Sequence, residues 1–159
     1  MTRRQIALGL IVKELGIKPN PQSLPERLIL QKALYLAQQK GANLGYHFYW
    51  YLRGPYSREL ATDALVAQKA GSKGWILDDE TKKVANSLKG FFEQLLGRRD
   101  SESQFELFAS ALFAIRNNQA QASDASALSD LLRKAGKDFS SKHVRSAVDK
   151  LKEEGFLSA

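Results

Sequence analysis

Hydrophobic residues recur three or four positions apart along most of the chain, a spacing typical of amphipathic helices. Each such segment is followed by glycine or by a polar turn, which ends a helix. The predicted apolar faces, in chain order, are Ile6, Leu10, Ile11 and Leu15; Leu28, Ile29, Tyr35 and Leu36; Leu60, Ala61, Ala64 and Leu65; Val84, Leu88, Phe91 and Leu95; and Phe105, Phe108, Leu112, Phe113 and Ile115. The third of these helices is predicted to reach Gly71.

Capping residues support several of the predicted helix starts. Ser23 and Glu26 have the spacing of a capping box, in which each side chain accepts a hydrogen bond from the other residue's backbone. Ser57 stands where it can cap the third helix. Ser101 and Gln104 repeat the capping-box spacing at the start of the fifth.

Residues 44–52 have a different pattern, with apolar and other aromatic residues alternating. This alternation predicts a strand or an extended arm. Gly54 and Pro55 follow it as a turn, because a residue before proline avoids the helical region. The short apolar run of residues 75–77 is predicted to pair with the aromatic run in a small two-stranded sheet.

The polar stretch of residues 117–124 is a candidate linker before a C-terminal pair of helices. The inward residues of this pair are Leu128, Leu131 and Leu132 in the first helix and Val144, Ala147, Val148 and Leu151 in the second, with Ser140 or Ser141 as cap. Phe156 and Leu157 would begin a wing strand, but with the given sequence ending at Ala159 we expect no complete winged helix.

The expected fold is therefore mostly α: a compact helical domain with a small two-stranded sheet and a C-terminal pair resembling a helix-turn-helix. Residues 1–117 would form the helical core with the aromatic strand and the Gly-Pro turn. Residues 118–159 would form the linker and the helix pair, packed on or appended to that core within a single domain overall.

Composition narrows the functional classes. The 159 residues have a formal net charge of +7 and contain no cysteine, which excludes disulfides, thiolate nucleophiles, cysteine-ligated zinc and iron–sulfur clusters. The apolar N-terminal stretch is interrupted by Lys13 and Glu14, well short of the roughly 20 residues that span a bilayer. We expect a cytoplasmic protein without a membrane partner.

Few residues suit catalysis or metal binding. The two histidines, His47 and His143, are far apart in the sequence and have no adjacent nucleophile. The acidic run of residues 78–80 is better explained as the start of a helix, where negative charge is favourable. Nucleotide-binding and acyl-transfer motifs are absent from the sequence. We expect no enzymatic activity, no cofactor and no metal.

Two regions are candidates for binding. Residues 133–150 contain six basic and two acidic residues, which suits phosphates, although they could instead be solvated faces of a helical hairpin. The nucleic-acid-binding candidates are Arg133, Lys137, Lys142, His143 and Arg145. The first 60 residues contain nine basic and three acidic residues together with the aromatic run. The partner-binding candidates there are Tyr46, Tyr51, Arg53, Gly54, Pro55, Tyr56 and Ser57. The tyrosine rings among them could instead belong to the core.

A tract of about thirty residues also resembles one family. Its residues are Gln31-Lys32-Ala33-Leu34-Tyr35-Leu36, Gly41, Leu44-Gly45-Tyr46-His47-Phe48, Tyr51, Gly54-Pro55-Tyr56-Ser57 and Leu60. The tract resembles the YwgA-like proteins and, more distantly, the SocA-type Panacea antitoxin domain. The resemblance implies a mostly helical, non-catalytic domain of prokaryotic and phage proteins, which in the Panacea branch binds and neutralises a toxin. The motif residues it carries over are Lys32, Tyr35, Tyr51, Gly54, Pro55 and Tyr56.

Two functional hypotheses follow. The first is a non-enzymatic binding module of the YwgA or antitoxin-like type, which acts through a protein partner such as a toxin. The alternative is a DNA-binding regulator or accessory factor that uses the basic C-terminal helix pair.

Overall fold

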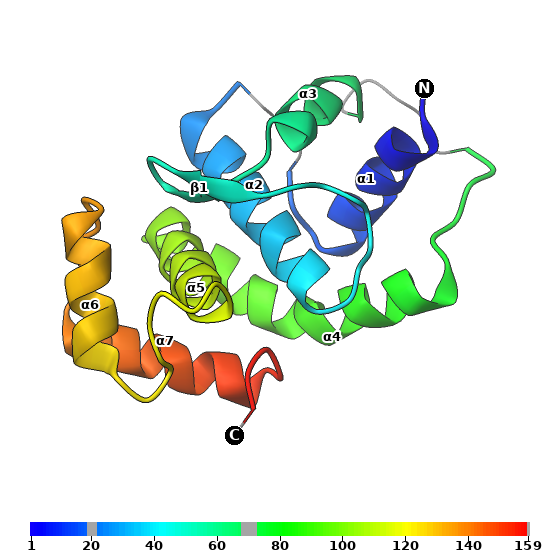
Figure 1. Ribbon diagram of the computed structural model, residues 1–159. Coiled ribbons are helices and arrows are strands. Elements are labelled where there is room, and N and C mark those ends of the chain that lie inside the picture. The colour runs from blue at the N-terminus through cyan, green and yellow to red at the C-terminus, as the bar shows by residue number, and fades with distance from the viewer. Residues whose placement is uncertain (19–21, 68–72, 159) are drawn as a thin grey trace.

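The computed structural model describes residues 1–18, 22–67 and 73–158. These residues form seven α-helices and one two-stranded sheet (Figure 1), which confirms the predicted mostly helical fold. The elements are α1 (Arg3–Glu14), α2 (Leu24–Gln39), β1 (Tyr49–Tyr51), β2 (Gly54–Tyr56), α3 (Arg58–Ala67), α4 (Asp79–Leu96), α5 (Ser101–Arg116), α6 (Ala125–Lys134) and α7 (Ser141–Glu153).

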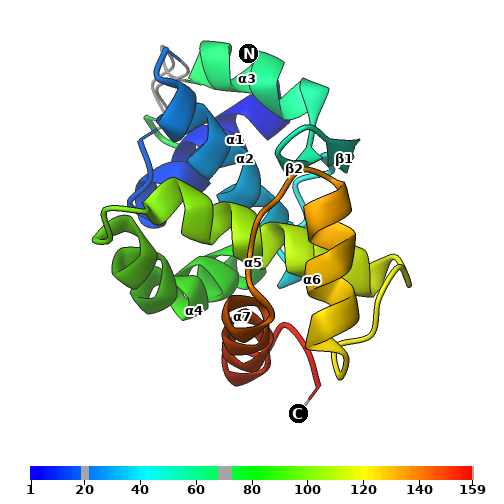
Figure 2. The same cartoon turned by 90° about the vertical axis from the view of Figure 1, so that its left-hand side faces the viewer.

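Helices α2 and α5 form the centre of the molecule and pack against each other. Every residue of α2 from Ile29 to Ala37 is buried. On one side of this pair lie α1, α3 and α4, and on the other side α6 and α7 pack against α5 (Figures 1 and 2). Because α2 is surrounded on all faces, its polar residues in this stretch are buried together with the apolar ones.

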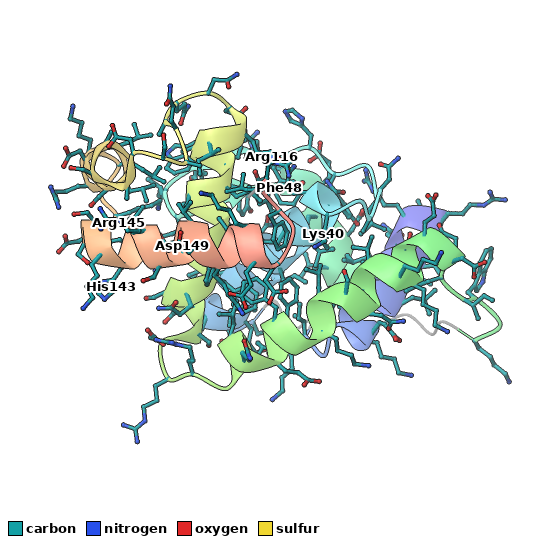
Figure 3. The ribbon with its side chains drawn as sticks, turned by 90° about the horizontal axis from the view of Figure 1, so that it is seen from below. Lys40, Phe48, Arg116, His143, Arg145 and Asp149 are labelled. Carbon is teal, nitrogen blue, oxygen red and sulfur yellow. The ribbon has the colours of Figure 1, made fainter. Side chains whose placement is uncertain are left out.

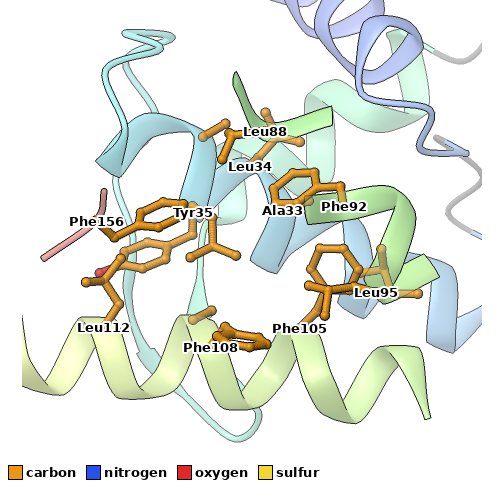
Figure 4. Close-up of a cluster of buried hydrophobic side chains, with 14 of the residues drawn as sticks. Ala33, Leu34, Tyr35, Leu88, Phe92, Leu95, Phe105, Phe108, Leu112 and Phe156 are labelled. Atoms are coloured by element: carbon orange, nitrogen blue, oxygen red, sulfur yellow. The ribbon is translucent and has the colours of Figure 1, made fainter. Parts of the chain in front are cut away.

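Aromatic rings fill much of the core (Figure 4). Phe91 meets Phe108 with the ring centroids 5.0 Å apart, and Phe92 meets Phe105 at 5.2 Å. Both pairs have the edge-to-face geometry that aromatic quadrupoles favour. These contacts join α4 to α5, and the predicted apolar face of α4 is confirmed as a core face.

The sheet differs from the predicted one. β1 pairs in antiparallel fashion with β2, so that Tyr51 lies opposite Gly54 and the connection is only Leu52 and Arg53. The chain turns back directly because Gly54 adopts a φ of +98°, a conformation that residues with a Cβ rarely adopt. The predicted strand at residues 75–77 was therefore wrong: these residues are outside any strand, and Ile76 is 88% exposed.

The helix caps match the predictions in part. Ser23 caps α2 by accepting a hydrogen bond from the Glu26 backbone N–H, and Ser57 accepts one from Leu60 at the start of α3. The predicted Ser101 cap of α5 was wrong by one position, since Asp100 is the N-cap residue. The Gln104 amide donates to the Asp100 carboxylate over 2.9 Å. The predicted end of the third helix at Gly71 lies outside the described residues.

After α7 the chain turns back into the core. Phe156 is buried, and its carbonyl accepts a hydrogen bond of 2.6 Å from the Arg116 guanidinium. The Lys40 ammonium donates to the Glu154 carbonyl and lies over the Phe156 ring, 5.1 Å from its centroid. Figure 3 shows Arg116 and Lys40 on the side of the core where the chain ends. Among the described helices, none has both the length and the apolar character needed to cross a membrane.

Candidate functional site

Two polar residues of α2 form hydrogen bonds with the backbone of the hairpin, formed by β1 and β2, and of the residue that follows it. The side-chain amide of Gln31 donates to the Ser57 carbonyl and accepts from the Ser57 N–H, both over 2.9 Å. The Lys32 ammonium donates to the Pro55 carbonyl over 2.8 Å. All of these groups are buried, so the backbone of β2 and of the residue after it is satisfied by side chains from a helix.

Gly54 allows this close approach of the hairpin to the helices. A Cβ at this position would lie 2.5 Å from the Ser110 hydroxyl oxygen and 3.6 Å from the Lys32 Cε atom. Its positive φ also disfavours any side chain. The Ser110 hydroxyl is buried and has no hydrogen-bond partner among the described residues. Both the conformation and the space at position 54 therefore require glycine.

A group of charges, buried except for Arg53, supports the turn of the hairpin. Lys137, in the connection between α6 and α7, donates to the Leu52 carbonyl over 2.9 Å and to Glu106 over 2.8 Å. Arg53 reaches the other oxygen of Glu106 over 3.3 Å. We call Lys32, Arg53, Glu106 and Lys137 the hairpin charge cluster. It joins α2, the hairpin, α5 and the α6–α7 connection, which runs beside the hairpin in Figure 2.

The cluster has three basic side chains and one carboxylate, and its burial and its charges both alter the pKa of Lys32. The pKa of the Lys32 ammonium is lowered from 10.5 to about 7. Burial is the largest cause; Glu106 opposes it, and the positive charges of Lys137 and Arg53 add to it. Desolvation disfavours the charged form of a lysine. Near neutral pH, a substantial fraction of Lys32 is therefore neutral.

A pocket of about 290 Å³ opens beside the hairpin, above Lys32. Its walls come from the N-terminal half of α2, from the hairpin and from α3. The lining residues are Leu24, Arg27, Leu28, Leu30, Gln31, Lys32, Tyr51, Leu52, Arg53, Tyr56, Ala61 and Ala64. We call this the hairpin pocket, and most of its lining is apolar.

Large apolar side chains stand exposed at the rim of the hairpin pocket. Leu52 at the hairpin tip is 74% exposed, Tyr51 is 51% exposed, and Leu24 at the start of α2 is 54% exposed. The charged residues among the described lining are Arg27, Lys32 and Arg53, all basic. The site is thus an apolar hollow with a positive rim and floor.

The predicted partner-binding residues divide into two groups in the structure. Tyr51, Arg53 and Tyr56 line the hairpin pocket. Gly54, Pro55 and Ser57 are buried in the base of the hairpin, where they form its contacts with α2 and α5, and Tyr46 is buried elsewhere. The assignment of these four as surface contacts is therefore corrected: all four are buried, and Gly54, Pro55 and Ser57 position the hairpin.

Tyr46 belongs to a separate buried network. Its hydroxyl donates to Asp63 over 2.9 Å, and Asp63 also accepts from Arg4 at 2.8 Å and from Gln5 at 3.0 Å. Burial, and then the hydrogen bond to Asp63, raise the pKa of the Tyr46 phenol. The network joins α1, α3 and the segment before β1, so Tyr46 is a structural residue.

The predicted nucleic-acid-binding residues also divide. Lys137 is only 4% exposed and its ammonium is bound to Glu106 and Leu52, so its assignment to a nucleic-acid surface is corrected. Arg133 pairs with Asp130 over 3.1 Å. Lys142, His143 and Arg145 are exposed in the first turns of α7, and Figure 3 shows His143 and Arg145 pointing outward there.

The described residues show no assembled metal site. Within residues 1–18, 22–67 and 73–158, no group of three or more His, Asp or Glu could hold a metal ion. Asp78 instead caps α4 by accepting from the Thr81 N–H over 2.7 Å. His47 and His143 line different grooves, one beside the end of α2 and the other between α4, α5 and α7.

Comparison with known proteins adds no relative: no family model, no curated protein and no solved structure matches the chain. The candidate site therefore rests on its own geometry. The sequence did not predict that Lys32, Glu106 and Lys137 come together at the site. The available signal was a polar pair, Gln31 and Lys32, within an otherwise apolar helical segment.

Proposed function

We propose that this chain is a non-enzymatic binding module that acts in the cytoplasm through protein–protein interaction, with the hairpin pocket as its contact surface. The observation that carries the proposal is the exposure of Leu24, Tyr51 and Leu52 around an apolar pocket. Exposed apolar groups that gather around a pocket are typical of interaction surfaces. Tyrosine and arginine, both present here, are enriched among residues that dominate binding energy.

The rigidity of the hairpin supports the same proposal. Three side chains fix its backbone: Gln31 at Ser57, Lys32 at Pro55 and Lys137 at Leu52. A surface that is already ordered loses little conformational entropy when a partner binds. The exposed rim residues are therefore presented on a fixed support.

Five of the six motif residues of the family resemblance lie in the hairpin or in its support. Of its motif residues, Lys32, Gly54 and Pro55 hold the hairpin in place, while Tyr51 and Tyr56 line the pocket. Proteins of the Panacea branch neutralise toxins by binding them. A prokaryotic or phage toxin is accordingly the first partner to test.

Affinity capture with matched variants tests the proposal. The double variant Leu24→Ser with Leu52→Ser removes two exposed apolar side chains from the pocket rim and leaves the net charge unchanged. The control, Trp75→Ser with Ile76→Ser, removes two exposed apolar side chains from the segment before α4, at the opposite end of the molecule from the hairpin (Figure 1). We expect crosslinked partners from an extract of the native host to be lost with the rim variant and kept with the control. Equal capture by both variants would overturn the proposal.

A second candidate function is DNA binding by the C-terminal pair. The observation that favours it is the exposure of Lys142, His143 and Arg145 together at the start of α7. A helix start with basic side chains can approach phosphates or the major groove. Of the five predicted residues, Lys137 is buried and Arg133 pairs with Asp130, so the candidate surface centres on the other three.

Binding to random duplex DNA over a salt series tests this second candidate. Each phosphate contact contributes a slope of about −0.9 to the log of the binding constant against log salt. The variant Lys142→Glu with Arg145→Glu should abolish binding, while Lys82→Glu with Lys83→Glu on exposed positions of α4 makes the same charge change elsewhere. A salt-independent affinity, or equal loss in both variants, would exclude α7 as the DNA-binding element.

A further inference from the structure

We propose that the hairpin pocket recognises an acidic amphipathic peptide segment of its partner. A large apolar side chain of that segment enters the pocket, and adjacent carboxylates pair with Arg27 and Arg53. This inference rests on the proposed function, because it names the chemistry of the partner at the same site.

The shape and lining of the pocket account for the apolar part of the ligand. The pocket holds about 290 Å³ between α2, the hairpin and α3, and its walls include Leu28, Leu30 and Ala64. Leu52 and Tyr51 extend the apolar surface outward from the rim. An apolar side chain that leaves water for these walls is stabilised in proportion to the area it buries. A flanking segment would also cover the exposed leucine at the hairpin tip.

The charges account for the acidic part. Arg27, Lys32 and Arg53 are the charged residues of the described lining. Glu106, the carboxylate of the hairpin charge cluster, is already engaged by Lys137 at 2.8 Å and by Arg53 at 3.3 Å. Positive charge therefore remains in excess at the pocket, where partial burial weakens the screening by solvent. A carboxylate compensates this excess, whereas a basic segment would add to it.

Proton uptake provides an independent signature of a carboxylate at this position. Lys32 faces Glu106 of α5, Lys137 of the α6–α7 connection and Arg53 of the hairpin, and its pKa is about 7. A negative charge brought to the pocket favours the ammonium form of Lys32. Binding at pH 8 should therefore take up a proton, and the variant Lys32→Met should remove that uptake.

Selection from a random twelve-residue peptide library displayed on phage tests the inference without a known partner. The library is selected on the wild-type chain, and the enriched peptides are then tested on the rim variant Leu24→Ser with Leu52→Ser. We expect enriched peptides that combine a large apolar residue with Asp or Glu and that lose binding to the rim variant.

The other outcomes separate the two proposals. Neutral or basic peptides that still need the rim residues would overturn the acidic partner and leave the protein-binding surface in place. Peptides that bind the wild type and the rim variant alike, or the absence of any enrichment, would overturn both.

Titration of one enriched acidic peptide then locates its carboxylates. Arg27→Gln and Arg53→Gln should each weaken binding about five- to tenfold, a loss in the range of the net contribution of one hydrogen bond. Arg99→Gln, on an exposed residue in the connection between α4 and α5, should leave the affinity unchanged. Circular dichroism confirms that each variant is folded. Calorimetry at pH 8 in two buffers of different ionisation enthalpy should show proton uptake, and equal heats in both buffers would overturn the placement of the carboxylate near Lys32.

Discussion

Lys137 and Glu106 form a 2.8 Å ion pair between buried side chains that are 31 positions apart in the sequence. The same ammonium donates to the Leu52 carbonyl, 85 positions away. One lysine therefore joins the C-terminal helix pair, the central helix α5 and the tip of the hairpin. The polar stretch before α6 separates these helices in sequence, but Lys137 attaches them to the candidate site.

Glu106→Gln should lower the free energy of unfolding by about 3 kcal/mol. The substitution removes the carboxylate of the hairpin charge cluster, and breaking a buried ion pair from one side leaves charge without compensation. Urea unfolding followed by circular dichroism measures the effect. The pair of Lys150 and the exposed Glu153, at 3.6 Å, provides the control, because Glu153→Gln should cost less than about 1 kcal/mol.

Adding Lys137→Met to Glu106→Gln should restore part of the lost stability. The double variant has one cation fewer in the cluster, and a buried pair can often be replaced by apolar groups at small cost. A double variant that is as unstable as the sum of both single variants would contradict the electrostatic coupling of the two residues.

Gly54→Ala should destabilise the fold more than Gly136→Ala. Both glycines have a positive φ, +98° and +84°, and the backbone strain alone costs about 1–2 kcal/mol for a residue with a Cβ. A Cβ at position 54 would also meet Ser110 at 2.5 Å, whereas nothing lies within 4 Å at position 136. Thermal unfolding of both variants isolates the steric contribution, and Ser110→Gly in the Gly54→Ala background should recover it. Equal losses in the two single variants would show that Ser110 moves aside without cost.

The stability of the protein should rise between pH 7 and pH 9.5 through Lys32. Its pKa is about 7 in the folded protein and 10.5 without the protein environment, so the unfolded chain binds more protons in this range. Stability then increases with pH by at most about 1.4 kcal/mol per unit from this one group. Denaturant unfolding of the wild type and of Lys32→Met should give curves that diverge over this interval. Parallel curves would contradict the lowered pKa.

Tyr46→Phe should lower the free energy of unfolding by about 1.5–3 kcal/mol, because the hydroxyl donates to the buried Asp63 carboxylate over 2.9 Å. The ring contact with Arg4, 4.7 Å from the ring centroid, would remain. Tyr49→Phe serves as the control, since its hydroxyl accepts from Arg58 in an exposed bond. A loss of the same size in both variants would show that the Asp63 network adds no specific stability.

Helical periodicity was sufficient to predict most of the fold. The face of α7 with Val144, Ala147, Val148 and Leu151 is buried as predicted, because this helix has one solvent-exposed side and one side packed on the core. The face of α1 was predicted less well: Leu8 and Val12 are buried, whereas Ile6 and Leu10 are partly exposed. In α2 the pattern did not predict the burial of Gln31 and Lys32, because the stretch from Ile29 to Ala37 is covered on all sides.

The candidate site was less accessible to prediction. The aromatic residues and the Gly-Pro pair predicted a binding site within residues 46–57, and part of this segment lines the hairpin pocket. The charge cluster could not be predicted, since Lys32, Glu106 and Lys137 come together only through the packing of α2, α5 and the α6–α7 connection. In the sequence, Lys137 was one basic residue among several, and its burial depends on a tertiary contact with Leu52.

The support of the hairpin also has a kinetic consequence. Its strands are adjacent in the sequence, yet the side chains that satisfy its carbonyls come from positions 32 and 137. Contacts between residues far apart in the chain form slowly, because closing a long loop costs entropy before the contact is gained. The hairpin should therefore become ordered late in refolding, after α5 and the C-terminal helices have docked. Pulse-labelling hydrogen exchange during refolding should show the amides of residues 49–56 protected after those of α5.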